Sequence, residues 1–138
     1  MICIIRIHGR VGLNKDVEET LKRLRLRKKY HCVVLNPTKE NLGMIKKTRN
    51  QIAFGEINKE TFEKLIEKRG EAIDKSKKIN AKEIISELEK GKKYTDLNLK
   101  PYFRLHPPRK GINSKVHFPR GVLGDNKEKI NDLILRML

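Results

Sequence analysis

The chain has 138 residues and carries 33 Lys and Arg against 17 Asp and Glu, which gives a formal net charge of +16. This length predicts one domain with a modest core, and the charged fraction of 36% predicts a densely charged surface. The sequence shows no apolar run of transmembrane length and no signal-peptide core, which argues against a membrane or secreted protein and predicts a cytoplasmic one.

The positive charge is concentrated toward the two ends of the chain. Residues 1–55 hold 13 Lys and Arg against 4 Asp and Glu, whereas residues 56–100 hold 12 against 10. Residues 101–138 again have an excess, with 8 against 3. This uneven distribution predicts surfaces with different roles, and the basic ones favour a polyanion such as nucleic acid as the partner.

Apolar spacing predicts five elements in the first 57 residues. They are a strand over residues 1–8, a helix from Asn14 to about Arg25, a strand over residues 30–35, a helix over residues 38–47 and a strand over residues 52–57. Asn14 and Thr38 are of the residue types that cap helix N-termini. The order strand–helix–strand–helix–strand predicts a small α+β sandwich.

The second half of the chain predicts helices joined by irregular segments. They are a helix over residues 59–69, a helix over residues 81–90, a linker over residues 92–102, a short strand over residues 103–105, an extended basic loop up to residue 124 and a final helix that contains Ile130, Leu133, Ile134 and Met137. Asn58 and Asn80 are candidate N-caps, and Asp125 with Glu128 forms a capping-box pattern before the final helix.

The strongest functional signal is a basic run at the end of the first predicted helix. No acidic residue occurs between residues 20 and 35, so the cationic side chains of the run must project into solvent together and repel one another. This pattern favours phosphate binding, and the alternative is a solvated charged face. The run contains Arg23, Arg25, Arg27, Lys28 and Lys29.

A second basic segment spans residues 103–120. It carries Arg104, His106, Arg109, Lys110, Lys115, His117 and Arg120. The prolines Pro107, Pro108 and Pro119 stiffen its backbone, so less conformational entropy is lost when it lies against a nucleic acid. The alternative for this segment is a flexible surface loop.

The other patterns in the sequence favour structural roles over a specific ligand site or catalysis. Gly9–Gly12 matches the GxxG loop of K-homology domains but follows a strand, which favours a simple turn that brings Arg10 near a phosphate. Cys3 and Cys32 lack the C-x-x-C spacing of a zinc site, even with His8 and His31 nearby, and are expected to be buried thiols. No Walker loop, nucleophile elbow or paired carboxylate suggests catalysis. The absence of Trp argues against a base-stacking surface of the RNA-recognition-motif or OB type.

Two separate stretches carry a family resemblance. The first contains Thr20-Leu21, Leu24, Leu26, Lys28, His31 and Val33, followed by Met44-Ile45 and by Ala53-Phe54-Gly55. The second contains FRLHPPRKG at residues 103–111 and KINDLILRM at residues 129–137. In this order they resemble the L-thirty family of large-subunit ribosomal proteins, in its longer archaeal and eukaryotic form. The resemblance covers residues 1–70 and 101–138, while residues 71–100 carry little of it.

The resemblance implies a fold and a function. It implies a three-stranded antiparallel sheet with helices on one face, a β-α-β-α-β core related to the ferredoxin-like arrangement, with an α-helical and extended C-terminal extension. Residues 1–70 would form the rRNA-binding core, and residues 71–138 an extension with a helix, the basic proline loop and a C-terminal helix that packs on the core. The implied role is a structural constituent of the large ribosomal subunit, next to other ribosomal proteins, without catalysis, cofactor, membrane or small-molecule substrate.

The expected rRNA-binding residues combine the basic run, the end of the second helix and the proline-rich segment. They are Arg10, Lys15, Arg23, Arg25, Arg27, Lys28, Lys29, Lys46, Lys47, Arg49, Asn50, Arg104, His106, Arg109, Lys110, His117 and Arg120. Two other functions stay open at this point: an RNA-processing or RNA-modifying enzyme, and a nucleic-acid-binding module outside the ribosome.

Overall fold

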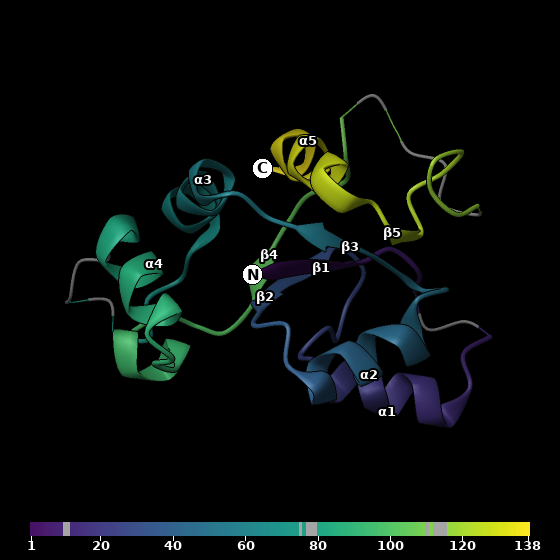
Figure 1. The fold of residues 1–138 in the computed structure, drawn as a ribbon, viewed down its shortest axis with the longest axis horizontal. Coiled ribbons are helices and arrows are strands. Elements are labelled where there is room, and N and C mark those ends of the chain that lie inside the picture. Colours follow the sequence, from purple (N-terminus) through teal and green to yellow (C-terminus); the bar gives the residue numbers. More distant parts are fainter. Residues whose placement is uncertain (10–11, 75, 77–79, 110, 112–115) are drawn as a thin grey trace.

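The computed structural model describes residues 1–9, 12–74, 76, 80–109, 111 and 116–138, and these residues form a mixed α+β fold (Figure 1). The strands are β1 (Ile2–Arg6), β2 (His31–Leu35), β3 (Ile52–Glu56), β4 (Phe103–Arg104) and β5 (Gly124–Asp125). The α-helices are α1 (Lys15–Arg23), α2 (Lys39–Thr48), α3 (Lys59–Arg69), α4 (Ala81–Glu89) and α5 (Ile130–Met137), and two short 3₁₀ helices are η1 (Tyr94–Leu97) and η2 (Lys127–Lys129).

The sheet has the strand order β4-β2-β1-β3-β5, with β1 in the centre. β1 pairs antiparallel with both β2 and β3, so the predicted three-stranded antiparallel core and the α+β class are confirmed. Two edge strands extend this core: β4 is antiparallel to β2, and β5 is parallel to β3. β5 lies where the sequence predicts only loop, because a strand of two residues is too short to show an alternating pattern.

Helices cover both faces of the sheet (Figure 1). On one face, α1 and α2 pack on Ile4, Val33 and Ile52, as the β-α-β-α-β prediction requires. The other face carries α3, α4 and α5, which pack on a cluster that includes Cys3 and Ile5. The expectation of helices on one face therefore holds for the core unit, and the later helices supply a second layer. No helix among the described residues is both long and apolar enough to cross a bilayer.

Residues 80–100 pack on the sheet instead of leaving it. Ile84, Ile85 and Leu88 of α4 are buried in the larger apolar cluster. The predicted linker over residues 92–102 contains η1, where the Tyr94 hydroxyl donates a hydrogen bond of 2.6 Å to the Val34 carbonyl of β2. The linker prediction was wrong here because the half-buried Tyr94 and the fully buried Leu99 anchor a segment that has no apolar period.

The C-terminal helix is fastened to the junction between β3 and α3 by a buried asparagine. The side-chain oxygen of Asn131 accepts a hydrogen bond of 3.0 Å from the Asn58 amide, and its amide group donates to the Glu56 carbonyl at 3.2 Å. Met137 and Leu138 are buried in the same apolar cluster as the α3 side chains. The division into a core over residues 1–70 and an extension over residues 71–138 stays a prediction.

The two cysteines are buried free thiols, as expected from their positions in strands. Cys3 and Cys32 are fully buried, and their Sγ atoms lie 3.1 Å apart across β1 and β2. Burial, followed by the contact with Cys3, raises the pKa of the Cys32 thiol well above its ordinary value. The protonated thiol therefore behaves as a small apolar side chain at neutral pH.

Gly55 sets how closely the C-terminal segment approaches β3. A Cβ atom added at Gly55 would lie 2.3 Å from the Lys127 carbonyl oxygen and 3.0 Å from the Ile130 side chain. We expect Gly55→Ala to lower the free energy of unfolding by about 1–3 kcal/mol, because overpacking forces backbone shifts. Gly43→Ala in α2 is the control, since no atom lies within 4 Å of its added Cβ. The control should gain up to about 1 kcal/mol of stability in urea denaturation. Equal stability of both variants would contradict the close approach.

Candidate nucleic-acid interface

The basic run forms the loop between α1 and β2, over residues 24–30. The helix ends at Arg23, two residues before the predicted end, because the chain turns in a Schellman motif. The Leu26 amide donates to the Leu21 carbonyl and the Arg25 amide to the Lys22 carbonyl, both at 2.9 Å. Arg25 adopts a left-handed backbone with φ of 66°. Glycine usually occupies this position, so the arginine is held there at a local conformational cost.

Apolar and basic side chains of this loop separate to opposite sides. Leu24 and Leu26 are buried against Ile4 and Leu21, whereas the cations between and after them are exposed. The exposed residues are Arg25, Arg27, Lys28 and Lys29. The Lys29 ammonium also lies 5.1 Å from the centre of the Tyr30 ring. The alternation thus anchors the loop through its leucines and presents its cations to solvent.

A buried arginine supports the loop from below. Arg6 of β1 is 2% exposed and lies on the α1–α2 face of the sheet. Its Nη1 donates a hydrogen bond of 2.7 Å to the Leu26 carbonyl, and its Nε donates one of 2.9 Å to the His8 carbonyl. Sequence reasoning missed this role, although a lone arginine among the β-branched residues of a buried strand was a visible signal. Arg6 positions the basic loop without facing solvent.

The edge strand β4 brings the second basic segment to the first. His31 of β2 is directly opposite Arg104 of β4 in the register. A surface cavity of about 540 Å³ opens between the loop and this strand. Its lining consists of Arg25, Arg27, Lys28, His31, Pro101, Tyr102 and Arg104. Arg104 therefore faces the same cavity as Arg25, Arg27 and Lys28, from which it is 76 to 79 positions away in the sequence, because β4 pairs with β2.

Two aromatic rings line this cavity together with the cations. The His31 and Tyr102 rings are stacked, with centroids 5.6 Å apart and planes inclined by 14°. The Arg104 guanidinium lies 5.8 Å from the centre of the Tyr102 ring, and hydrogen bonding to Tyr102 raises the Arg104 pKa further above its already high value. Neither ring was among the predicted site residues. The chain has few aromatic residues, and nothing in their spacing predicts that these two rings are in contact.

His31 is neutral at physiological pH. Burial lowers its pKa below the ordinary value, and the positive charges of Arg104, Lys28 and Arg6 lower it further. The histidine thus adds an uncharged ring to the cavity, while the charge there comes from arginine and lysine.

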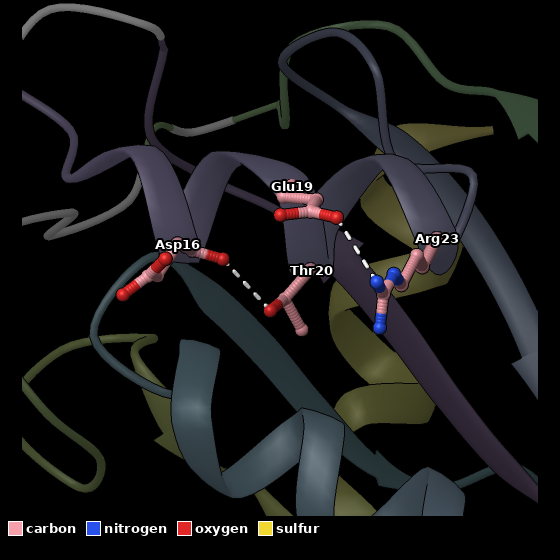
Figure 2. A network of polar contacts seen from close by, with 4 residues as sticks. All are labelled: Asp16, Glu19, Thr20 and Arg23. Atoms are coloured by element: carbon pink, nitrogen blue, oxygen red, sulfur yellow. Dashed lines mark hydrogen bonds and ion pairs between the residues drawn. The ribbon is translucent and has the colours of Figure 1, made fainter.

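Arg23, another predicted site residue, is paired within its own helix. Its Nη2 lies 2.9 Å from the Glu19 carboxylate, and the two side chains are 71% and 63% exposed (Figure 2). One turn earlier, the Thr20 hydroxyl donates a hydrogen bond of 2.8 Å to the Asp16 carbonyl. An exposed pair of this kind contributes about 0–1 kcal/mol, so Arg23 can exchange Glu19 for another anion at little cost.

The end of α2 meets the proline-rich segment at a second point. Lys46, Lys47 and Arg49 are exposed there. The Asn50 side-chain oxygen and the His117 Nε2 atom are 3.0 Å apart, which joins residues 67 positions apart in the sequence. The predicted Asn50 and His117 are therefore neighbours, at the end of the sheet where β2 and β3 begin.

The remaining predicted residues are placed differently. Lys15 and Arg109 are exposed, and Arg120 is exposed at a turn near β5. His106 is half-buried, with its ring nitrogens engaged by the Pro107 and Leu138 carbonyls, so it fastens the C-terminus more than it faces solvent. Arg10 and Lys110 lie outside the described residues. Within the described part of the chain, no three His, Cys, Asp or Glu side chains form a group fit to hold a metal ion.

Comparison with known proteins identifies the family. Residues 2–52 match the family model described as ribosomal protein L30p/L7e. The chain is 43% identical to large ribosomal subunit protein uL30 of Archaeoglobus fulgidus, an alignment that covers 99% of each chain. It is 39% identical to the protein of the same name from Nanoarchaeum equitans, over 100% of this chain and 99% of the relative.

The chain belongs to the ribosomal protein L30p/L7e family. The family resemblance inferred from two separate stretches is thereby confirmed over nearly the whole length. The match to archaeal uL30 also extends through residues 71–100, where the sequence by itself showed little resemblance.

Proposed function

We propose that this protein is a structural constituent of the large ribosomal subunit that binds rRNA through the cationic end of its sheet. One observation carries the proposal: the loop before β2 and the end of β4 place Arg25, Arg27, Lys28 and Arg104 around a single cavity. Membership of a family whose members are named large ribosomal subunit proteins supports the ribosomal location, which is cytoplasmic.

The antiparallel register explains how distant basic segments gather. The starts of β2 and β3 lie beside the end of β1, because β1 runs antiparallel to both strands. The α1–β2 loop carries Arg25, Arg27, Lys28 and Lys29, and the end of α2 with the turn before β3 carries Lys46, Lys47 and Arg49. β4 ends next to His31. One end of the sheet therefore collects positive charge from three segments of the chain.

The proposed mechanism is charge neutralisation combined with recognition of shape. Double-stranded RNA hides its base edges in a deep groove, so a protein recognises its phosphates and backbone geometry. Arginine side chains make bidentate contacts to phosphate, while lysines act as point charges. The interface we propose comprises the predicted residues that the structure describes, with His106 as a support for the C-terminus.

Several finer points belong to the same proposal. Residues 1–70 are the rRNA-binding core, and residues 71–138 are an extension that contributes Arg104 to the interface. The protein acts as a scaffold and not as an enzyme, and its other partners are neighbouring ribosomal proteins. The exposed apolar side chains Leu42, Ile73 and Leu135 are suitable contacts for such neighbours.

The salt dependence of RNA binding tests the proposal. If roughly six to ten phosphates are contacted, the affinity for large-subunit rRNA should fall by about 10³–10⁵ between low and moderate salt. The measurement is filter binding of the full chain to rRNA at a series of salt concentrations. A shallow slope would contradict the phosphate contacts. Competition with duplex DNA separates the ribosomal function from a general nucleic-acid-binding one, since equal competition would favour the general one.

A further inference from the structure

The cavity between the α1–β2 loop and β4 is lined by aromatic rings as well as by the cations that a phosphate site needs. Phosphate binding requires only cations, yet the His31 and Tyr102 rings form a stacked pair in its wall. Both rings are half-buried and line the cavity, and Tyr102 also packs against the margin of the smaller apolar cluster. A pair placed to fill the core would instead be enclosed, as Phe103 is on the opposite face.

The strand pairing fixes the positions of these rings. Tyr102 and Arg104 alternate with buried Phe103, so their side chains emerge on the same face of the sheet as His31. The Arg104 guanidinium lies over the Tyr102 ring, 5.8 Å from its centre. The flat apolar surface of the rings is therefore rigidly placed and is bordered by guanidinium and ammonium groups.

We propose that this cavity binds one unpaired nucleotide of an RNA, with its base stacked on the Tyr102–His31 pair and its phosphate held by Arg25, Arg27 and Lys28. The inference rests on the proposed function and adds the form of RNA that the site accepts. Unpaired bases in RNA are recognised by stacking on aromatic rings and on guanidinium planes, and the cavity offers both. A volume of about 540 Å³ is ample for a single nucleotide.

The charge and polarity of the cavity favour a nucleotide over an acidic peptide. A carboxylate side chain would use the cations but would leave the stacked rings without a partner. A nucleotide satisfies both, since its base is planar and its phosphate is anionic. Base stacking tolerates any of the four bases, so the site requires an unpaired base and not a given sequence.

Two RNA hairpins that differ in a single feature test the proposal. One is fully paired, and the other carries one unpaired 2-aminopurine, a fluorescent base whose emission falls on stacking. The full chain should bind the bulged hairpin more tightly and quench its fluorescence. Tyr102→Ala should abolish the quenching and remove roughly tenfold of the preference for the bulge, by the usual worth of one base–aromatic stack. Tyr102→Phe retains the ring and should keep both effects.

The outcomes separate this inference from the proposed function. Equal binding of both hairpins by the unmodified chain, with unchanged fluorescence, would overturn the nucleotide site. The proposed rRNA binding would still stand if the affinity for rRNA depends steeply on salt. Failure to bind either hairpin or rRNA at low salt would overturn both. Displacement of the hairpins by a polyglutamate peptide, without any quenching by the protein, would also overturn the nucleotide site and would favour an acidic protein as the partner. The quenching is read on the unmodified chain, so the test holds even if Tyr102→Ala unfolds.

Discussion

Charge reversal at Arg25 and Arg27 weakens rRNA binding by at least about a hundredfold. Both side chains line the cavity between the α1–β2 loop and β4. A charge-assisted contact contributes about 1.5–3 kcal/mol, so the loss of two contacts lowers the affinity by at least about 10². The double variant Arg25→Glu with Arg27→Glu should also show a salt slope that is smaller by about two phosphate contacts. Filter binding against salt concentration gives both quantities.

The fold should survive this double substitution. Both side chains are exposed, and the leucines beside them, not the arginines, hold the loop on the core. Glutamate is no more strained than arginine at the left-handed position of Arg25. The control is Lys64→Glu with Lys82→Glu, which makes the same change in net charge on exposed residues of α3 and α4. An equal loss of affinity in the control would show that only net charge matters and would contradict a local interface.

Replacing Arg6 by methionine lowers the free energy of unfolding by about 2–4 kcal/mol. Methionine keeps most of the buried volume but cannot donate to the Leu26 and His8 carbonyls, which Arg6 reaches at 2.7 and 2.9 Å. Removing the donor takes the hydrogen bond from the buried Leu26 carbonyl oxygen, and each charge-assisted bond is worth about 1.5–3 kcal/mol. This is a large share of the stability of about 5–15 kcal/mol expected of a domain. Urea denaturation measures this loss of stability, and the dependence of the unfolding free energy on urea concentration should stay unchanged.

The substitution Arg49→Met is the matched control for stability. Arg49 is exposed after α2, so its loss should change the free energy of unfolding by no more than about 0.5 kcal/mol. At a temperature where it is still folded, Arg6→Met should in addition bind rRNA more weakly, because the loop that Arg6 supports is no longer fixed. Full stability of Arg6→Met would mean that the Leu26 and His8 carbonyls find other donors.

The local elements followed from short-range patterns. Strands β1, β2 and β3 lie within a residue or two of the predicted limits, because β-branched alternation and burial agree there. The N-caps Asn14, Thr38 and Asn58 each accept a backbone hydrogen bond with their side chains, as their residue types predict. The basic run was visible because no acidic residue interrupts it. These features depend only on residues close together in the chain.

The site could be predicted only in pieces. The cations of the loop and of the proline-rich segment were found separately, and the role of Arg6 was not. Tyr102 and His31 were missed as a pair, because only the pairing of β4 with β2 places His31 opposite Arg104, two residues from Tyr102. His106 was counted among the cations, although the C-terminal carbonyl engages it in the structure. Pairing between distant segments has no short-range pattern.

The sequence by itself determined the three central strands, the five α-helices, the separation of charge toward the ends of the chain and the family. Each of these features depends on composition or on the spacing of residues that lie close together in the chain. The tertiary structure alone decided that both basic segments border one cavity, that a buried arginine holds the loop and that two aromatic rings meet there. The physical reason is that strand register and helix packing depend on contacts between residues many positions apart, which no local periodicity records.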